Sequence, residues 1–318
     1  MPKKDTMNVD LLKKIKDTKF LKEKTKDEYV RRINDFCEYL EKDLSYVMKH
    51  PKWFVKKVRE YIEENNYGIH TADKICSCFM ACFNYNQDFK EAEKDLFDQW
   101  VSETKSIKDE IDSKYESNAP TLKQKGAYIS YNQLIEKRDS LKKGLQSRLL
   151  LFMYTEIPPV RNDYHLLKIY KSKPHYDTGN YMIIDEKNPM IILNDFKTDK
   201  TYEQIKIKIP DTLFDEIKES LKETPREYLF VSTRNKKPYE NDNTFSRWAN
   251  RTLRAIFGNN INLTTLRHIY ISRRDLKLEN KSGLERKEIA KIMGHSLEQQ
   301  QRYLWHSWLE ENKIDYTD

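Results

Sequence analysis

The spacing of apolar residues changes along the chain, and this change limits the folds open to it. Apolar side chains in the first part recur at helical spacing, as in Tyr29, Ile33, Phe36 and Leu40. A capping-box pattern at residues 25–28 predicts that this helix begins there. A further helical pattern spans residues 71–85. Residues 1–118 are therefore expected to form an all-helical domain.

The second part combines strand and helix patterns. Short apolar runs at 181–184 and 190–193 flank a turn, and Ile205, Ile207 and Ile209 alternate with lysines. They predict a three-stranded antiparallel sheet. Helical spacing returns after Pro210, including residues 244–257. The expected fold class is mainly α with a small antiparallel β-sheet.

A polar stretch separates the two parts. It contains Pro120 and Gly126, which favour a connection over a regular element. Residues 119–126 are therefore predicted to be a linker, followed by a second domain at residues 127–318 that ends in a C-terminal tail.

The charges are unevenly distributed. Residues 1–60 hold 17 Lys and Arg against 11 Asp and Glu, residues 61–120 hold 6 against 13, and residues 121–318 hold 35 against 27. Two basic regions around an acidic one suit a protein that touches DNA from two sides. Lysine-rich composition from an AT-rich genome is an equally good explanation of the charge alone.

Several classes of protein are disfavoured. The chain has no run of about 18 apolar residues and no apolar signal core at its start, so neither a membrane helix nor secretion is expected. An intracellular location is expected, in the nucleus, a viral factory or the cytoplasm. Its 7 glycines form no phosphate-cradling loop. No cofactor or metal is expected.

The cysteines Cys76, Cys78 and Cys82 cluster within one helical pattern. A zinc site is one interpretation, but the residues between them are mostly apolar and no partner set follows at metal-ligand spacing. Buried thiols on a helix are the favoured interpretation.

The residue types with the clearest chemistry lie near the end of the chain. Arg267, His295 and Tyr303 occur in this order, with the tyrosine eight positions after the histidine. An arginine can hold the free oxygens of a phosphodiester, a histidine can hydrogen-bond the phosphate, and a tyrosine can attack it covalently. Upstream, Arg161 and Lys197 can supply a second clamp and a proton donor.

These segments resemble the tyrosine recombinase (phage integrase) family. The resemblance covers about residues 145–305 and lies in four segments: Thr-Leu-Arg-His around Arg267, Lys-Ile-Met-Gly-His-Ser around His295, Gln-Arg-Tyr at Tyr303, and residues 155–164 around Arg161. The last segment is most similar to members carried by virophages, large DNA viruses and Polinton-type mobile elements.

The resemblance implies an N-terminal core-binding domain and an α+β catalytic domain with catalytic Arg161, Lys197, Arg267, His295 and Tyr303. It implies a metal- and ATP-independent enzyme that cuts double-stranded DNA through a 3′-phosphotyrosyl intermediate and rejoins it, as in site-specific recombination and integration.

Some assignments stay open at this point. Lys200 rivals Lys197 as the general acid, and Tyr316 rivals Tyr303 as the nucleophile. Thr264 stands where many family members carry a histidine or lysine, which puts the rate of DNA cleavage in doubt. His268 either compensates for the missing side chain or has only a packing role. A type IB topoisomerase and a catalytically lapsed DNA-binding protein are the alternative functions.

The apolar residues after Tyr303 allow two further interpretations. Trp305 and Trp308 either fold over their own catalytic domain or dock onto a neighbouring copy, as the family's C-terminal segments often do. The second alternative implies a homotetramer on DNA held together by its tails.

Overall fold

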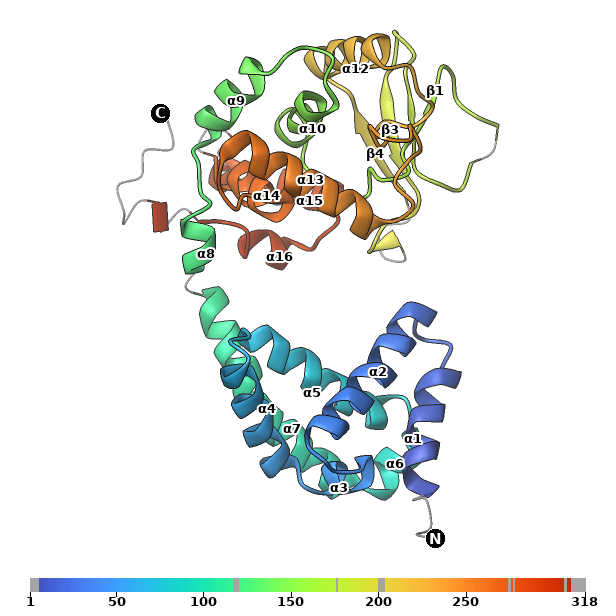
Figure 1. Ribbon diagram of the computed structural model, residues 1–318, viewed down its shortest axis with the longest axis vertical. Coiled ribbons are helices and arrows are strands. Elements are labelled where there is room, and N and C mark those ends of the chain that lie inside the picture. The colour runs from blue at the N-terminus through green and yellow to red at the C-terminus, as the bar shows by residue number, and fades with distance from the viewer. Residues whose placement is uncertain are drawn as a thin grey trace. The chain divides into compact units, whose positions relative to one another are not determined.

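The computed structural model divides into two compact units, residues 1–117 and 118–318 (Figure 1). It describes residues 6–116, 120–175, 177–199, 204–273, 276, 278–305 and 308–309. The boundary between the units falls one residue before the end of the expected N-terminal domain. The short helix α8 (Leu122–Lys125) lies within the expected linker.

The N-terminal unit consists of helices throughout its described residues, as predicted. They are α1 (Thr6–Asp17), α2 (Glu23–Tyr39), α3 (Leu44–Lys49), α4 (Pro51–Glu64), α5 (Ile69–Asn84), α6 (Gln87–Ala92) and α7 (Lys94–Glu116). Their shared core is aromatic: Phe54 packs against Phe36, Phe79 and Trp100 with ring centroids 4.6 to 5.6 Å apart. The Trp100 indole N–H donates to the Met48 carbonyl at 2.8 Å, which satisfies the one polar atom of that side chain.

The predicted capping box at residues 25–28 is wrong. Helix α2 begins at Glu23, and the backbone N–H groups of Thr25 and Lys26 both donate to the Lys22 carbonyl. Thr25 therefore already lies within the first turn, where its side chain cannot cap the helix.

The cysteines are free thiols within this helical core. Cys76, Cys78 and Cys82 are buried on α5, as the sequence pattern favoured, and Cys37 is half-buried. Burial raises the pKa of Cys37, Cys76 and Cys78 to about 12, so these thiols are protonated and unreactive near neutral pH.

The C-terminal unit surrounds a small sheet with helices. After α8 come α9 (Tyr131–Ser140), α10 (Gln146–Thr155), β1 (Lys168–Tyr170), β2 (Tyr181–Ile183), β3 (Met190–Leu193), β4 (Ile205–Lys208), α12 (Asp211–Glu223), α13 (Asp242–Phe257), α14 (Leu263–Ser272), α15 (Gly283–Ile292) and α16 (Leu297–Gln301). The fold is thus mainly helical with one small sheet, in agreement with the expected class.

The sheet has the strand order β1-β2-β3-β4 and is mixed. The three predicted strands are confirmed, because β2 pairs antiparallel with β3, and β3 with β4. The prediction of a wholly antiparallel sheet is wrong, since β1 adds a strand parallel to β2. This strand has only three half-buried residues, and so carries no alternation that could reveal it.

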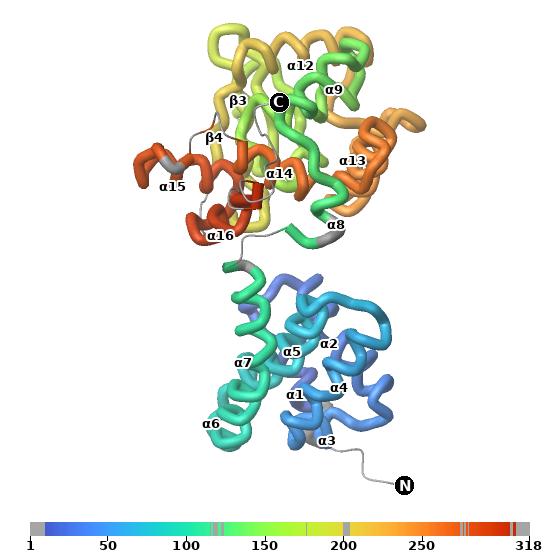
Figure 2. Tube along the Cα trace, turned by 90° about the vertical axis from the view of Figure 1, so that its left-hand side faces the viewer, coloured from blue at the N-terminus to red at the C-terminus, as the bar shows by residue number. Residues whose placement is uncertain are grey.

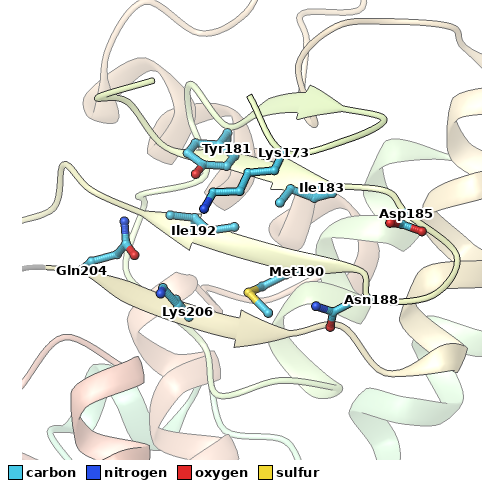
Figure 3. A pocket seen from close by; sticks show the side chains of 9 residues that line it. All are labelled: Lys173, Tyr181, Ile183, Asp185, Asn188, Met190, Ile192, Gln204 and Lys206. Atoms are coloured by element: carbon cyan, nitrogen blue, oxygen red, sulfur yellow. The ribbon is translucent and has the colours of Figure 1, made fainter. Parts of the chain in front are cut away.

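The two faces of the sheet differ. Met182, Ile191 and Ile207 point into the main hydrophobic core. On the other face, Figure 3 shows Tyr181, Ile183, Met190 and Ile192 lining a cavity of about 350 Å³, with Lys173 and Lys206 beside them.

Helix α10 is the central element of this unit. It packs against α9, α12, α13 and α14, and its residues from Arg148 to Thr155 are all buried. Arg148 forms a buried ion pair with Glu216 of α12 at 2.9 Å. Its Nη1 also donates to three carbonyls at the end of α9, at 2.9 to 3.0 Å. This one guanidinium therefore joins three helices.

No helix among the described residues is long and apolar enough to cross a membrane.

The buried pair yields a stability prediction. Glu216→Ala should lower the free energy of unfolding of the C-terminal unit by about 3–5 kcal/mol, because it leaves the buried Arg148 charge without its buried partner. The remaining carboxylate, Asp139, is exposed and lies 3.7 Å away. Urea unfolding of the full chain measures this. Glu219→Ala on the same helix is the control, since its pair with Lys222 is exposed and should change stability by about 1 kcal/mol or less. Equal losses in the two variants would contradict the assignment.

Candidate active site

Helix α14 carries Arg267 into the interior. Asn262 caps the helix by accepting from the Thr265 backbone N–H at 3.0 Å, and every residue of α14 except Thr264 is buried. Arg267 is only 1% exposed, and its Nη2 donates to the Met293 carbonyl at 2.9 Å. Its Nε and Nη1 have no partner among the described residues. A buried guanidinium with unused donors is a site that an anion can fill.

The end of α15 supplies the carbonyl that holds this arginine. Gly294 has φ of +67°, and the backbone N–H groups of Gly294 and His295 donate to the carbonyls of Lys291 and Ala290 at 2.9 and 3.0 Å. This is a Schellman motif, for which a glycine in the left-handed conformation is strongly preferred.

The Gly294 carbonyl gathers two further segments. It accepts from Arg161 Nη1 at 3.2 Å and from Thr198 Oγ1 at 3.3 Å. Arg161 follows α10 by six residues, and Thr198 lies between β3 and β4. Met293 and Gly294 together therefore bring Arg161, Arg267 and the loop that carries Lys197 to one place.

His295 follows directly and is 3% exposed. Its Nδ1 lies 3.1 Å from the Ser296 carbonyl, which can only accept, so Nδ1 carries the proton. Burial and the nearby Arg267 and Arg161 lower the pKa of His295 to about 4. At neutral pH its Nε2 is thus an unprotonated acceptor, and it has no partner among the described residues.

The Tyr303 ring covers these groups. It stacks on the His295 ring with centroids 5.2 Å apart, and the Arg267 guanidinium carbon lies 5.1 Å from its centre. Tyr303 itself is 9% exposed. Figure 2 shows the elements that bring these residues together, with α15 and α16 beside α14. Arg267, His295 and Tyr303 thus lie together in the structure, and their chemical roles stay a prediction.

The backbone of Tyr303 is held by α14. Its carbonyl lies 3.0 Å from His268 Nδ1 and accepts from Ser272 Oγ at 3.3 Å. Ser272 Oγ also accepts from the Trp305 backbone N–H at 2.9 Å. Ser272 was not anticipated from the sequence, although its position four residues after His268 places both on one face of α14.

His268 has a packing role in this structure. Its ring lies flat on Trp305, with centroids 4.1 Å apart and an angle of 8°. Burial lowers its pKa to about 4, so the ring is neutral near pH 7. The His268 ring holds the Tyr303 backbone, because its Nδ1 donates to the Tyr303 carbonyl. Nδ1 is therefore not directed at the unpaired donors of Arg267.

Two other predicted positions, Lys197 and Thr264, lie in more open surroundings. Lys197 is exposed on its loop, one residue before the anchored Thr198. Thr264 is exposed near the start of α14. Lys200 and Tyr316 lie outside the described residues.

The described part of the tail packs on its own unit. Trp305, Trp308 and Leu309 are buried, and both indoles contact Tyr128, with ring centroids 6.2 and 5.6 Å away. Of the two interpretations of these tryptophans, the structure shows the intramolecular one.

No protein-family model matches the chain, and no curated protein does. Among solved structures it is similar to one described as "Crystal structure of XerA recombinase", with a TM-score of 0.41 and 14% identity over 97% of this chain and 100% of that chain. The function therefore has to be inferred from the site itself.

The two neutral histidines predict an acid-sensitive fold. A histidine with a folded pKa of about 4 and an unfolded value near 6.5 stabilises the protein fully above pH ~6.5, and this stability is lost as pH falls towards 4. For each ring the loss is on the order of 2–3 kcal/mol. The double variant His268→Asn, His295→Asn should show a flatter pH dependence in urea unfolding than the unchanged chain. Parallel curves would contradict the buried neutral state.

Proposed function

We propose that this chain is a DNA strand-transfer enzyme of the tyrosine recombinase type, with Tyr303 as its nucleophile. The observation that carries the proposal is the group of unpaired polar atoms beside the Tyr303 ring: Nε and Nη1 of Arg267 and Nε2 of His295. Leaving such atoms buried without partners costs free energy, so the two Arg267 donors favour an anionic ligand, and the His295 Nε2 acceptor favours a hydroxyl group that donates to it.

The phosphate of a DNA strand is the anion that fits a site with a tyrosine at its centre. It would accept hydrogen bonds from Arg267 and Arg161, which neutralise the charge that grows in the pentacoordinate transition state. Because Arg267 is 1% exposed beneath the Tyr303 ring, the ring has to move aside when the phosphate enters. This movement would bring the phenol oxygen to a position beside the phosphorus.

The chemical step is a transesterification. The Tyr303 oxygen forms a bond to phosphorus, and the bond from phosphorus to the 5′ oxygen breaks. The phenolic proton passes to His295 Nε2, and Lys197 gives a proton to the leaving 5′ oxygen. A 5′-hydroxyl from another strand then reverses these steps and releases Tyr303. The number of phosphate ester bonds is unchanged, so no nucleotide has to supply energy, and the two arginines supply the positive charge that a metal ion supplies in other phosphoryl-transfer enzymes.

The N-terminal unit offers a surface suited to holding the duplex. Arg31, Lys74, Tyr39, Tyr61 and Tyr67 line a surface cavity of about 300 Å³, together with Asp35, which forms an ion pair with Arg31. Basic and aromatic side chains together are typical of nucleic-acid surfaces. We assign this unit the role of the core-binding domain, which grips the duplex. We assign the residues near the unit boundary the role of a linker between the two domains.

The proposed strand transfer also implies how many copies of the chain act together and which process they serve. Exchange between two duplexes involves four strand cleavages, which we assign to four copies of the chain. With Trp305 and Trp308 buried in their own unit, such an assembly has to use other surfaces, or else release the tail. The similarity of residues 155–164 to mobile-element and viral integrases favours DNA integration, in whichever compartment holds the target DNA.

The nucleophile gives the first test of this proposal. Tyr303→Phe keeps the ring over Arg267 and removes only the attacking oxygen, so it should bind duplex DNA normally and form no covalent adduct. A pool of nicked duplexes of random sequence, resolved by denaturing electrophoresis before and after protease treatment, reports the adduct. Undiminished adduct in the variant would transfer the role to another tyrosine, such as Tyr316.

The wild-type result separates the alternatives. A covalent adduct with strand exchange identifies a recombinase, whereas an adduct that only rejoins its own strand and relaxes supercoils identifies a topoisomerase. Binding without any adduct from the unchanged chain would show a DNA-binding protein that has lost its chemistry.

The general acid gives a second test. A 5′-bridging phosphorothioate has a sulfur leaving group that needs no proton, so Lys197→Ala should cleave normal DNA about 10²-fold or more slowly and recover on the sulfur substrate. Arg161→Ala is the control, because it removes a group that neutralises the phosphate charge. A better leaving group does not restore that group, so this variant should stay slow on the sulfur substrate. Recovery by Lys200→Ala and not by Lys197→Ala would assign the proton to Lys200.

A further inference from the structure

The outer face of the sheet carries an apolar surface that the proposed chemistry does not use. The strand register places Tyr181 of β2 opposite Ile192 of β3, and Ile183 opposite Met190. Side chains that lie directly opposite each other on paired strands share one face of the sheet. All four line the cavity of about 350 Å³ shown in Figure 3. Together these four residues form the apolar floor of the cavity.

Two lysines flank this floor from opposite sides. Lys206 of β4 is paired with Ile192, so it lies on the same face one strand further along. Lys173 comes from the connection between β1 and β2, and Figure 3 shows its amino group directed toward Ile192. Both lysines are exposed, and neither forms an ion pair with another described residue. Their ammonium groups are therefore available to a ligand.

The two ends of the cavity differ in charge. Figure 3 shows Asp185 and Asn188 at the end formed by the turn between β2 and β3, and Gln204 at the opposite end, nearer to the two lysines. A negative group is favoured at the lysine end and disfavoured beside Asp185. A ligand with one anionic end and an apolar body fits this distribution of charge.

The cavity also has the size and composition of a small-molecule site. Its volume of about 350 Å³ lies at the low end of the roughly 300–1,000 Å³ that is typical of ligand pockets. Such pockets are mostly apolar, with a few polar groups that fix the orientation of the ligand. The strands β3 and β4 also flank the loop of Thr198, whose Oγ1 donates to the Gly294 carbonyl. An occupant would therefore contact two strands that hold this loop.

We propose that this cavity binds a small amphipathic carboxylate, with its carboxylate group between Lys173 and Lys206 and its apolar body on the floor of the cavity. Each ammonium group would donate a charge-assisted hydrogen bond to the carboxylate. The apolar body would remove its own surface and that of the floor from water. This inference is independent of the proposed function, because it concerns another surface and involves no DNA.

Calorimetric titration of the full chain with octanoate tests the proposal. Octanoate should bind at a single site, about 10-fold more tightly than octanol, which has the same chain without the charge. It should also bind far more tightly than acetate, which has the charge without the chain. Octylamine carries the opposite charge and should bind more weakly than octanol, because the lysines repel it.

Matched variants locate the site. The double variant Lys173→Met, Lys206→Met keeps apolar stems and removes both charges, so it should bind octanoate about 10-fold more weakly and octanol as the parent does. Lys208→Met is the control, because Lys208 lies on the same strand and face as Lys206 but does not line the cavity. It should change the affinity for octanoate about 2-fold or less.

A change in the floor gives a second, independent readout. Met190→Glu places a carboxylate where the apolar body lies, so it should abolish octanoate binding. Met190 is only half-buried, so the circular dichroism of this variant should match that of the parent. The proposal would be overturned by an absence of octanoate binding, by an affinity for octanol or acetate equal to that for octanoate, or by equal losses in Lys208→Met and the double variant.

Discussion

The left-handed turn at Gly294 is the constraint on which the candidate site depends. The last carbonyls of a helix lack partners within it, and the Schellman motif satisfies those of Ala290 and Lys291. The carbonyl of Met293 accepts from Arg267, and the carbonyl of Gly294 accepts from Arg161 and Thr198. Positive charge is favourable at a helix C-terminus, so the same turn that ends α15 also attracts the two guanidiniums.

The arrangement leaves charge without full compensation. Burial lowers the pKa of Arg267 and raises that of the nearby Asp163 carboxyl, although the two arginines act against the latter effect. The same surroundings keep His295 neutral. A buried guanidinium without a full counter-charge beneath the Tyr303 ring is unfavourable in free energy, and a bound phosphate would relieve this cost. The proposed movement of Tyr303 follows from this imbalance, because the ring offers the guanidinium only its π face.

The sequence predicts this site better than it predicts the elements around it. Arg267, His295 and Tyr303 are recognisable because each is a chemically demanding residue type within an ordered motif, and the structure does bring them together. Thr198 and Ser272 escape prediction because their roles depend on which backbone atoms lie opposite them. Strand β1 is missed because three half-buried residues show no period, and the Thr25 cap is wrong because Lys22 starts the helix one turn earlier. From the sequence, the tryptophans after Tyr303 are equally suited to docking onto a partner and to packing on their own unit. Their contact with Tyr128 could not be predicted, because it depends on how the chain folds.

The most direct measurement of this account compares two glycines with the same backbone conformation. Gly294 and Gly258 both have φ near +68° at helix ends, and a Cβ at either position meets no close backbone contact. Gly294→Ala and Gly258→Ala should therefore lose similar stability, about 1–2 kcal/mol each. Single-turnover cleavage of a nicked duplex, measured where both variants are folded, should fall on the order of 10²-fold for Gly294→Ala and stay near the parent rate for Gly258→Ala. Equal cleavage rates in the two variants would contradict the claim that the Gly294 turn assembles the active site.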